Sequence, residues 1–295
     1  MTALLRDRTA IIVLLGPALA LYAAVMLVPI VWTIGYTPFE GSIIGGFTFV
    51  GTKNFETLLT DTEFHNALRF SIGYAIVSTV GQVGAGLLLA LAYVFWLGRS
   101  STLVRTVVFF PIVLPTVAVS ALFVKLFAIA PQYGLLNATL ETVGLDALIQ
   151  PWLGQPATAS AALVFMDVWR ASGFYAIILF AGLVEVPAEV LDAARVDGAR
   201  GLTMFRRVLF PFLRPILFTA IIFALVGTLK VFDSVVALTR GGPGSATTPL
   251  TLYMFDTSFK YLDYGYGSTI AVALSVLCLV VTLALFRFAR GDVDR

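Results

Sequence analysis

The chain has 295 residues, of which 59% are hydrophobic and 12% are charged, and its mean hydropathy is +0.95. This composition is far more apolar than that of a soluble domain, so it indicates an integral membrane protein. The net charge of +2 is too small to indicate a nucleic-acid partner.

Six apolar runs of about 20 residues predict six transmembrane helices. They cover residues 9–35, 67–96, 106–128, 160–183, 216–238 and 264–288. The first run belongs to a stretch, Thr9 to Phe39, that has no charged residue and is longer than the apolar region of a signal peptide, about 7 to 15 residues. We therefore expect a retained first helix and an all-α membrane fold.

Basic residues are distributed unequally between the two sides of this topology. Twelve lie in the N-terminal segment, the second and fourth connections and the C-terminal segment, whereas the other three connections hold Lys53, Arg240 and Lys260. Because cytoplasmic loops carry the excess of lysine and arginine, both termini and the fourth connection are predicted to be cytoplasmic.

Two of the outward connections have their own signals. Within the third, GLLNATLETVGLDALI is predicted to form a short amphipathic helix at the outer surface. The fifth contains TRGGPGSATTPL, whose glycines and prolines predict an irregular turn.

The fourth connection, residues 187–215, is a charged insert between two apolar runs. Its helix formers predict a first short helix over 188–196, which Gly198 ends, and a second over 202–209. Pro211 and Pro215 then set the start of the fifth span. We expect two short helices at an angle to each other, outside the membrane.

This insert has two possible roles. Its arginines could meet anionic lipid heads, as on an interfacial amphipathic helix. Alternatively, Val190, Ala194 and Gly198 are spaced by four and form a face of small residues that a protein could approach closely, with Phe205 as an aromatic knob. The small residues favour docking of a cytoplasmic protein.

The insert resembles the EAA loop of bacterial ATP-binding cassette (ABC) importer permeases. That pattern runs Glu-Ala-Ala, three residues, Gly, nine residues, Ile, one residue, Leu-Pro. The corresponding residues here are Asp192, Ala193, Ala194, Gly198, Val208, Phe210 and Pro211. The resemblance implies that the loop inserts into a cleft of a nucleotide-binding subunit and couples it to the membrane, through Asp192, Ala193, Ala194, Gly198, Phe205, Val208 and Pro211.

Three further stretches are similar to carbohydrate-uptake permeases of the maltose and glycerol-3-phosphate type, and the N-terminal portion resembles the first of two such permeases. They are FVGTKNFETLLTD, GLLNATLETVGL and KVFDSVVALTRGGPGSATTPLTLYMFDTSF. The resemblance implies a type I importer transmembrane domain. Residues 67–289 would form its five-helix core, after an N-terminal region, 1–66, that holds the first helix, and before a cytoplasmic tail, 290–295.

The resemblance also implies the partners. They are a second homologous permease, two ATPase subunits that bind ATP and Mg²⁺, an extracytoplasmic solute-binding protein, a sugar and the lipid of a bacterial inner membrane.

Residue types that are scarce or missing limit the chemistry of this chain. No lysine follows a glycine, so there is no P-loop and we expect no intrinsic ATPase and no enzyme activity. One cysteine, Cys278, excludes an intrachain disulfide, and one histidine, His65, leaves no metal cluster and no Ser-His-Asp site. We expect Cys278 in a helix and His65 in an outer loop.

Ionisable residues inside the predicted spans are costly and indicate function. They include Lys125, Asp167, Arg170, Lys230 and Asp233. At about 1.5 Å per residue, the last four reach similar depths. Either they neutralise each other between helices, or they line a route for a sugar, and one residue can do both. The candidates for the route are Gln82, Asp167, Trp169, Arg170, Tyr175, Lys230, Phe232 and Asp233. We expect Asp167→Ala and Lys230→Ala to reduce uptake and to leave assembly intact.

Other functions remain open at this level. An ion-gradient-driven transporter could use Asp167 or Asp233 as its ion site, although no convincing repeat relates the two halves of the chain. A membrane-embedded enzyme or scaffold has only the buried charges in its favour.

Overall fold

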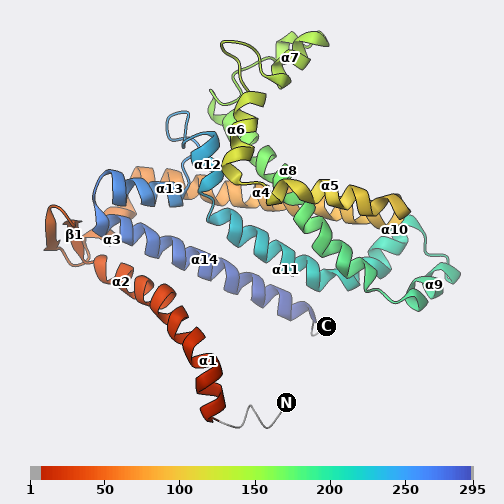
Figure 1. Cartoon of the computed structure of the whole chain (residues 1–295), viewed down its shortest axis with the longest axis horizontal. Coiled ribbons are helices and arrows are strands. Elements are labelled where there is room, and N and C mark those ends of the chain that lie inside the picture. The colour runs from red at the N-terminus through yellow and green to blue at the C-terminus, as the bar shows by residue number, and fades with distance from the viewer. Residues whose placement is uncertain (1–7, 294–295) are drawn as a thin grey trace. The chain divides into compact units, whose positions relative to one another are not determined.

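The computed structural model describes residues 8–293, and these are mostly helical (Figure 1). Within them, five helices are long and apolar enough to cross a membrane, and one bent pair of helices makes a sixth candidate. The elements are α1 (Arg8–Tyr22), η2 (Ala23–Leu27), α2 (Val28–Tyr36), β1 (Phe39–Ser42), β2 (Gly46–Phe49), α3 (Lys53–Thr60), α4 (Thr62–Phe95), η3 (Gly98–Ser100), α5 (Ser101–Val113), α6 (Thr116–Leu126), α7 (Leu135–Thr142), η4 (Asp146–Leu148), α8 (Pro156–Val184), α9 (Ala188–Val196), α10 (Gly201–Met204), η5 (Phe205–Leu209), α11 (Phe210–Leu229), α12 (Asp233–Leu238), α13 (Leu250–Phe255), η6 (Asp256–Lys260) and α14 (Tyr264–Val293).

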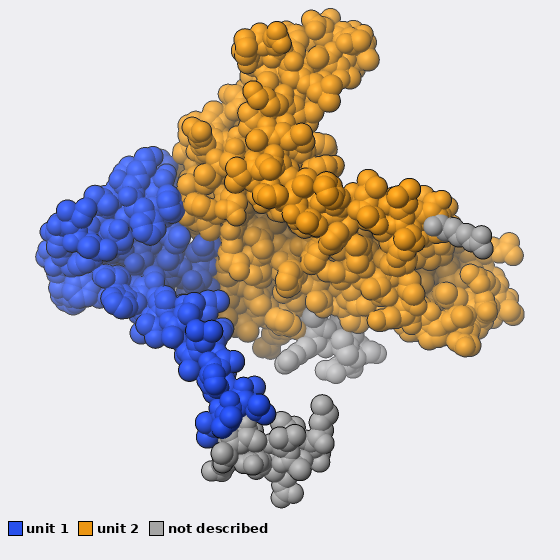
Figure 2. All heavy atoms as spheres, viewed as in Figure 1, with its two compact units in different colours: residues 1–64, 253–276 blue, residues 65–252, 277–295 orange. Residues whose placement is uncertain are grey.

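The helices divide into two compact units (Figure 2). One comprises residues 1–64 and 253–276, and the other residues 65–252 and 277–295. The larger unit holds every ionisable residue that the sequence placed inside a span.

In the smaller unit, the first span runs through α1, η2 and α2, as predicted. No residue in the most apolar part of this span is buried by the rest of the chain. A hairpin of β1 and β2 follows, where the sequence analysis expected no strand. It forms because Gly46, with φ +82, supplies the turn between two short segments that contain Phe39 and Phe49. The two rings pack edge to face at 5.6 Å.

Asp61 joins three elements of the smaller unit. Its carboxylate accepts hydrogen bonds from the hydroxyl of Tyr253, at 2.5 Å, and from the hydroxyl of Tyr266. The backbone N–H of Glu63 donates to the other oxygen at 2.9 Å, which caps the start of α4. Partial burial alone would raise the pKa of Asp61, but these hydrogen bonds outweigh it and the pKa is lowered.

In the larger unit, two predicted spans are interrupted. The prediction of one helix over 106–128 is wrong, because α5 and α6 meet at an angle of 98°. Leu114 precedes Pro115 and adopts an extended conformation, which the proline ring favours. The prediction of one helix over 216–238 is also wrong, since α11 ends at Leu229 and α12 begins only at Asp233.

The insert of the fourth connection is partly as predicted. The first short helix is α9, and Gly198 follows it with φ +81, a conformation that favours glycine. The second, over 202–209, is not separate, because α10, η5 and α11 form one continuous helix from Gly201 to Leu229. Pro211 lies in the first turn of α11, just after the π turn η5, where its missing N–H is tolerated.

Three smaller predictions can also be compared with the fold. The short helix predicted within the third connection is α7, Leu135–Thr142. Cys278 lies in α14, and so in a helix, as predicted. The prediction of a loop for His65 is wrong, because α4 begins at Thr62 and includes it.

A stripe of polar residues on α4 connects this helix to its neighbours. Ser71, Tyr74, Ser78 and Gln82 recur every three or four residues, and all are buried. The Ser71 hydroxyl accepts the Leu250 N–H of α13 at 2.9 Å, and Thr228 of α11 donates to Ala75 O at 3.4 Å. Inside a membrane the hydrophobic effect does not drive helices together, because lipid tails are as apolar as the helix surfaces. Polar contacts of this kind therefore help to hold the helices together.

Candidate functional site

A cavity of about 410 Å³ lies in the larger unit. Helices α4, α8, α11 and α12 contribute most of its lining, with Ile112 from α5 and Thr116 from α6. Its polar lining consists of Tyr74, Gln82, Thr116, Asp167, Arg170, Tyr175, Thr228, Lys230, Asp233 and Ser234. Such a wall, with donors and acceptors among apolar side chains, suits a small polar solute.

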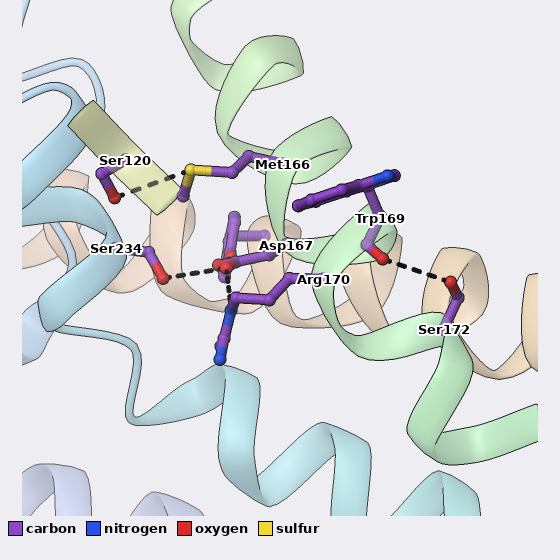
Figure 3. A network of polar contacts seen from close by, with 8 residues as sticks. Ser120, Met166, Asp167, Trp169, Arg170, Ser172 and Ser234 are labelled. Atoms are coloured by element: carbon purple, nitrogen blue, oxygen red, sulfur yellow. Dashed lines mark hydrogen bonds and ion pairs between the residues drawn. The ribbon is translucent and has the colours of Figure 1, made fainter. Parts of the chain in front are cut away.

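Asp167 is the centre of a hydrogen-bond network at this cavity (Figure 3). Its side chain is almost fully buried, and its carboxylate accepts hydrogen bonds from the hydroxyl of Tyr74 and, at 2.9 Å, from the hydroxyl of Ser234. Nε of Arg170 lies 3.4 Å from the same carboxylate. Asp167 thus joins α4, α8 and α12, and its charge is compensated inside the protein.

Arg170 keeps part of its binding capacity. Only Nε is engaged by Asp167, and in Figure 3 the far nitrogens of the guanidinium point away from the carboxylate. A guanidinium has five N–H donors, so several are left for another group in the cavity.

Lys230 and Asp233 differ from Asp167 both in burial and in the bonds of their side chains. Both are exposed and line the cavity, and neither side chain forms an ion pair or hydrogen bond with another residue in the range 8–293. The interruption between α11 and α12 places them there: Lys230 caps the end of α11, and Asp233 opens α12. The backbone freed by this break is satisfied in part, since the Thr251 hydroxyl donates to Val231 O.

Seven of the eight residues predicted for the solute route line this cavity. They are Gln82, Asp167, Arg170, Tyr175, Lys230, Phe232 and Asp233. The eighth, Trp169, does not, because its ring packs against Phe123 of α6 with centroids 5.5 Å apart. The sequence also allowed pairing of charges between helices, but in the structure Asp167 forms its ion pair with Arg170 on its own helix.

Tyr74 and Ser234 were missed by the sequence analysis. A signal for Tyr74 was present, because the polar stripe on α4 has helical spacing and includes both Tyr74 and Gln82. Ser234 gave no comparable signal, since its role depends on the break between α11 and α12.

The first helix of the fourth connection, α9, packs one side against the rest of the larger unit and leaves the other side exposed. Leu191 and Ala194 of α9 pack against the apolar cluster of α4, α8 and α11, whereas Ala193 is exposed and Val196 is 88% exposed. The small-residue face that includes Ala194 is therefore turned partly inward. Phe205 is also half-buried against this cluster.

The remaining predicted coupling residues lie near the end of α9 and beyond. Asp192 forms an exposed ion pair with Arg195 at 2.7 Å. After α9, the N–H of Ala199 bonds to Ala194 O at 2.8 Å, so Gly198 closes the helix in a regular C-terminal turn. Val208 packs on the same apolar cluster. The roles assigned to these residues in coupling stay predictions.

Comparison with known proteins identifies the family. The sequence profile described as "Binding-protein-dependent transport system inner membrane component" matches residues 82–291. The chain is 35% identical over 242 residues to the probable ABC transporter permease protein YurN of Bacillus subtilis, covering 82% of each chain. It is 30% identical to the sulfoquinovosyl glycerol transport system permease protein SmoG of Agrobacterium fabrum, covering 97% of this chain and 92% of that one.

A solved structure has the same fold. A chain of a bacterial ABC transporter involved in the import of the acidic polysaccharide alginate superposes with a TM-score of 0.84 at 21% identity, covering 98% of both chains. The resemblance noted in the sequence is thereby confirmed, and an ion-gradient-driven transporter is not favoured. The chain belongs to the family of inner membrane components of binding-protein-dependent transport systems, as a multi-pass permease subunit of the ABC type.

Proposed function

We propose that this chain forms half of the translocation pathway for a sugar or sugar-like solute, in an importer driven by separate ATPase subunits. The observation that carries the proposal is the cavity between α4, α8, α11 and α12, with its unpaired Lys230 and Asp233. The name of the SmoG relative, which refers to a glycoside, supports a sugar as the solute class.

The lining matches the chemistry of a sugar. Hydroxyl groups both donate and accept hydrogen bonds, and here Lys230 offers donors, Asp233 acceptors and Gln82 both. Phe174 and Tyr175, which pack edge to face at 5.2 Å, provide apolar surface for the ring of a sugar. Asp167 has a different task in this proposal: it positions Arg170 and Ser234.

We expect a second subunit to complete the cavity. Phe223, Lys230 and Asp233 line it and are exposed in this chain. Inside a membrane, charged side chains need a protein or water-filled surrounding, which a second homologous permease would complete. The other partners we propose are two ATPase subunits, which bind ATP and Mg²⁺, and an extracytoplasmic solute-binding protein. The chain itself would have no ATPase activity, since it lacks a P-loop.

Coupling would pass from α9 to the cavity through packed helices. We place both termini and α9 in the cytoplasm of a bacterial cell, where α9 would meet the ATPase. Leu191 and Ala194 of α9 pack on the cluster that also contains Leu179 of α8 and Leu213 of α11. Because α8 carries Arg170 and α11 ends next to Lys230, a shift of α9 would change the shape of the cavity.

The test is solute uptake by the complete transporter in proteoliposomes, with ATP inside or with an ion gradient only. We expect uptake that requires ATP and is insensitive to an uncoupler. Uptake that survives ATP depletion and collapses with the uncoupler would overturn the proposal.

A further inference from the structure

A second hollow of the larger unit lies between α4 and α8. It has a volume of about 570 Å³ and, apart from Arg69 and Ser160, an almost entirely apolar lining. Gly73 and Ala161 keep it open because they have small side chains, and Val77 and Phe165, each 56% exposed, form its walls. We call it the α4–α8 groove.

The two helices run in the same direction along the groove. Gly81 packs against Val168, Gly86 against Ala176 and, further along, the ring of Tyr93 against that of Phe180. The residue numbers of the contacting pairs rise together along both helices, which is the pattern of parallel helices. The N-terminal ends of both helices therefore lie at the same end of the groove.

The polar groups of the groove gather at that end. Arg69 and Ser160 are the first residues of each helix that line it. The Arg69 side chain is exposed and forms no ion pair or hydrogen bond with the residues described. From Arg69 to Val77 the groove then continues for about 12 Å at 1.5 Å per residue, with apolar side chains.

We propose that the α4–α8 groove binds one anionic phospholipid, with its phosphate at Arg69 and an acyl chain along Gly73, Val77 and Phe165. Its polarity matches an amphiphile: the cation of Arg69 lies at one end, and an apolar channel follows it, while the Ser160 hydroxyl donates to the Pro156 carbonyl at 2.8 Å. Its length of about 12 Å matches one leaflet of a hydrocarbon core about 30 Å thick. An unpaired arginine on a helix that can span the membrane gains a partner for its charge.

A soluble solute is a poorer occupant, because beyond Arg69 and Ser160 the groove offers it few polar groups. A helix of a partner subunit would fill an apolar groove, but it would leave Arg69 unpaired unless it also carried an acid. The phospholipid satisfies both ends. Tyr74 lines both the groove and the solute cavity, but the proposal does not rest on the proposed transport function.

Photolabelling tests the site. The complete transporter is reconstituted in phosphatidylcholine vesicles that contain phosphatidylglycerol with a diazirine in its acyl chain. We expect labelled peptides that include residues 69–77 and 160–168. Unlabelled phosphatidylglycerol should compete about fivefold better than phosphatidylcholine, a ratio typical of one basic group near an anionic lipid.

Two variants separate the head group from the acyl chain. Arg69→Gln should abolish the preference for phosphatidylglycerol and retain some labelling. Gly73→Leu should abolish labelling at this site, because a Cβ at Gly73 meets open space and the new side chain fills the groove. Gly84→Leu is the matched control, since Gly84 lies on the same helix, also faces open space and is outside the groove.

Equal labelling of wild type, Gly73→Leu and Gly84→Leu would overturn the proposal. So would the absence of labelling in wild type together with loss of subunit association in Gly73→Leu, because that result would assign the groove to a partner helix.

Discussion

The two charged regions of the cavity are built differently. On α8, Asp167 is buried and bonded to Tyr74, Ser234 and Arg170. At the break between α11 and α12, Lys230 and Asp233 are exposed and unpaired within the described chain. A bonded charge stabilises the helix arrangement, whereas an unpaired charge is available to a ligand. We therefore assign structural support to Asp167 and solute contact to Lys230 and Asp233.

The largest effect is expected from Asp167→Ala. The variant leaves Tyr74, Ser234 and Arg170 without their common partner, and breaking a buried charged network costs about 3–5 kcal/mol. We expect a lower melting temperature and poor assembly of the purified transporter, in contrast to the intact assembly predicted from the sequence. A melting temperature within error of that of the wild type would contradict this role, and Asp167 would then be assigned to solute contact, like Lys230 and Asp233.

Lys230→Ala should affect transport and not stability. A hydrogen bond to a charged group contributes about 1.5–3 kcal/mol, so we expect the apparent affinity for the solute to fall about tenfold or more. The measurement is the KM of uptake in proteoliposomes, beside the melting temperature. Lys125→Ala is the matched control, because Lys125 is an exposed lysine of α6 outside the cavity. Equal effects of the two variants would contradict the assignment.

Gly198→Val extends the comparison to the fourth connection, residues 187–215. Gly198 has φ +81, and a β-branched residue there costs about 1–2 kcal/mol. Gly144 is a close control: it follows α7 in the same way, with φ +74, and both glycines face open space. We expect Gly198→Val to separate ATP hydrolysis from uptake and Gly144→Val to leave them coupled. Similar behaviour of both variants would mean that backbone strain alone explains the result.

The smallest effect is expected at Asp61, a bonded carboxylate outside the cavity. Because its folded pKa is lowered, its stabilising contribution is present above the unfolded pKa of about 3.9 and is lost as the pH falls through the folded value. The difference in melting temperature between wild type and Asp61→Asn should therefore narrow below about pH 4. A difference in melting temperature that does not change with pH would mean that Asp61→Asn destabilises the fold through lost packing and not through the lost charge.

The sequence predicted the five long apolar helices, the first helix of the insert and seven of the cavity residues, because apolar runs, glycine and charges in apolar surroundings act locally. It did not predict the breaks at Leu114 and Lys230. A proline such as Pro115 can bend a helix or be accommodated within one, as Pro211 is, and neighbouring helices decide the outcome. The partners of Asp167 were likewise hidden, since Tyr74 and Ser234 meet it only after the helices pack.

The most direct test of the division between bonded and unpaired charges is a paired measurement on Lys230→Ala: the KM of ATP-driven uptake and the melting temperature, from one preparation. The division predicts a KM raised about tenfold or more with an unchanged melting temperature. A lower melting temperature with an unchanged KM would contradict it, because Lys230 would then stabilise the fold in the way assigned to Asp167.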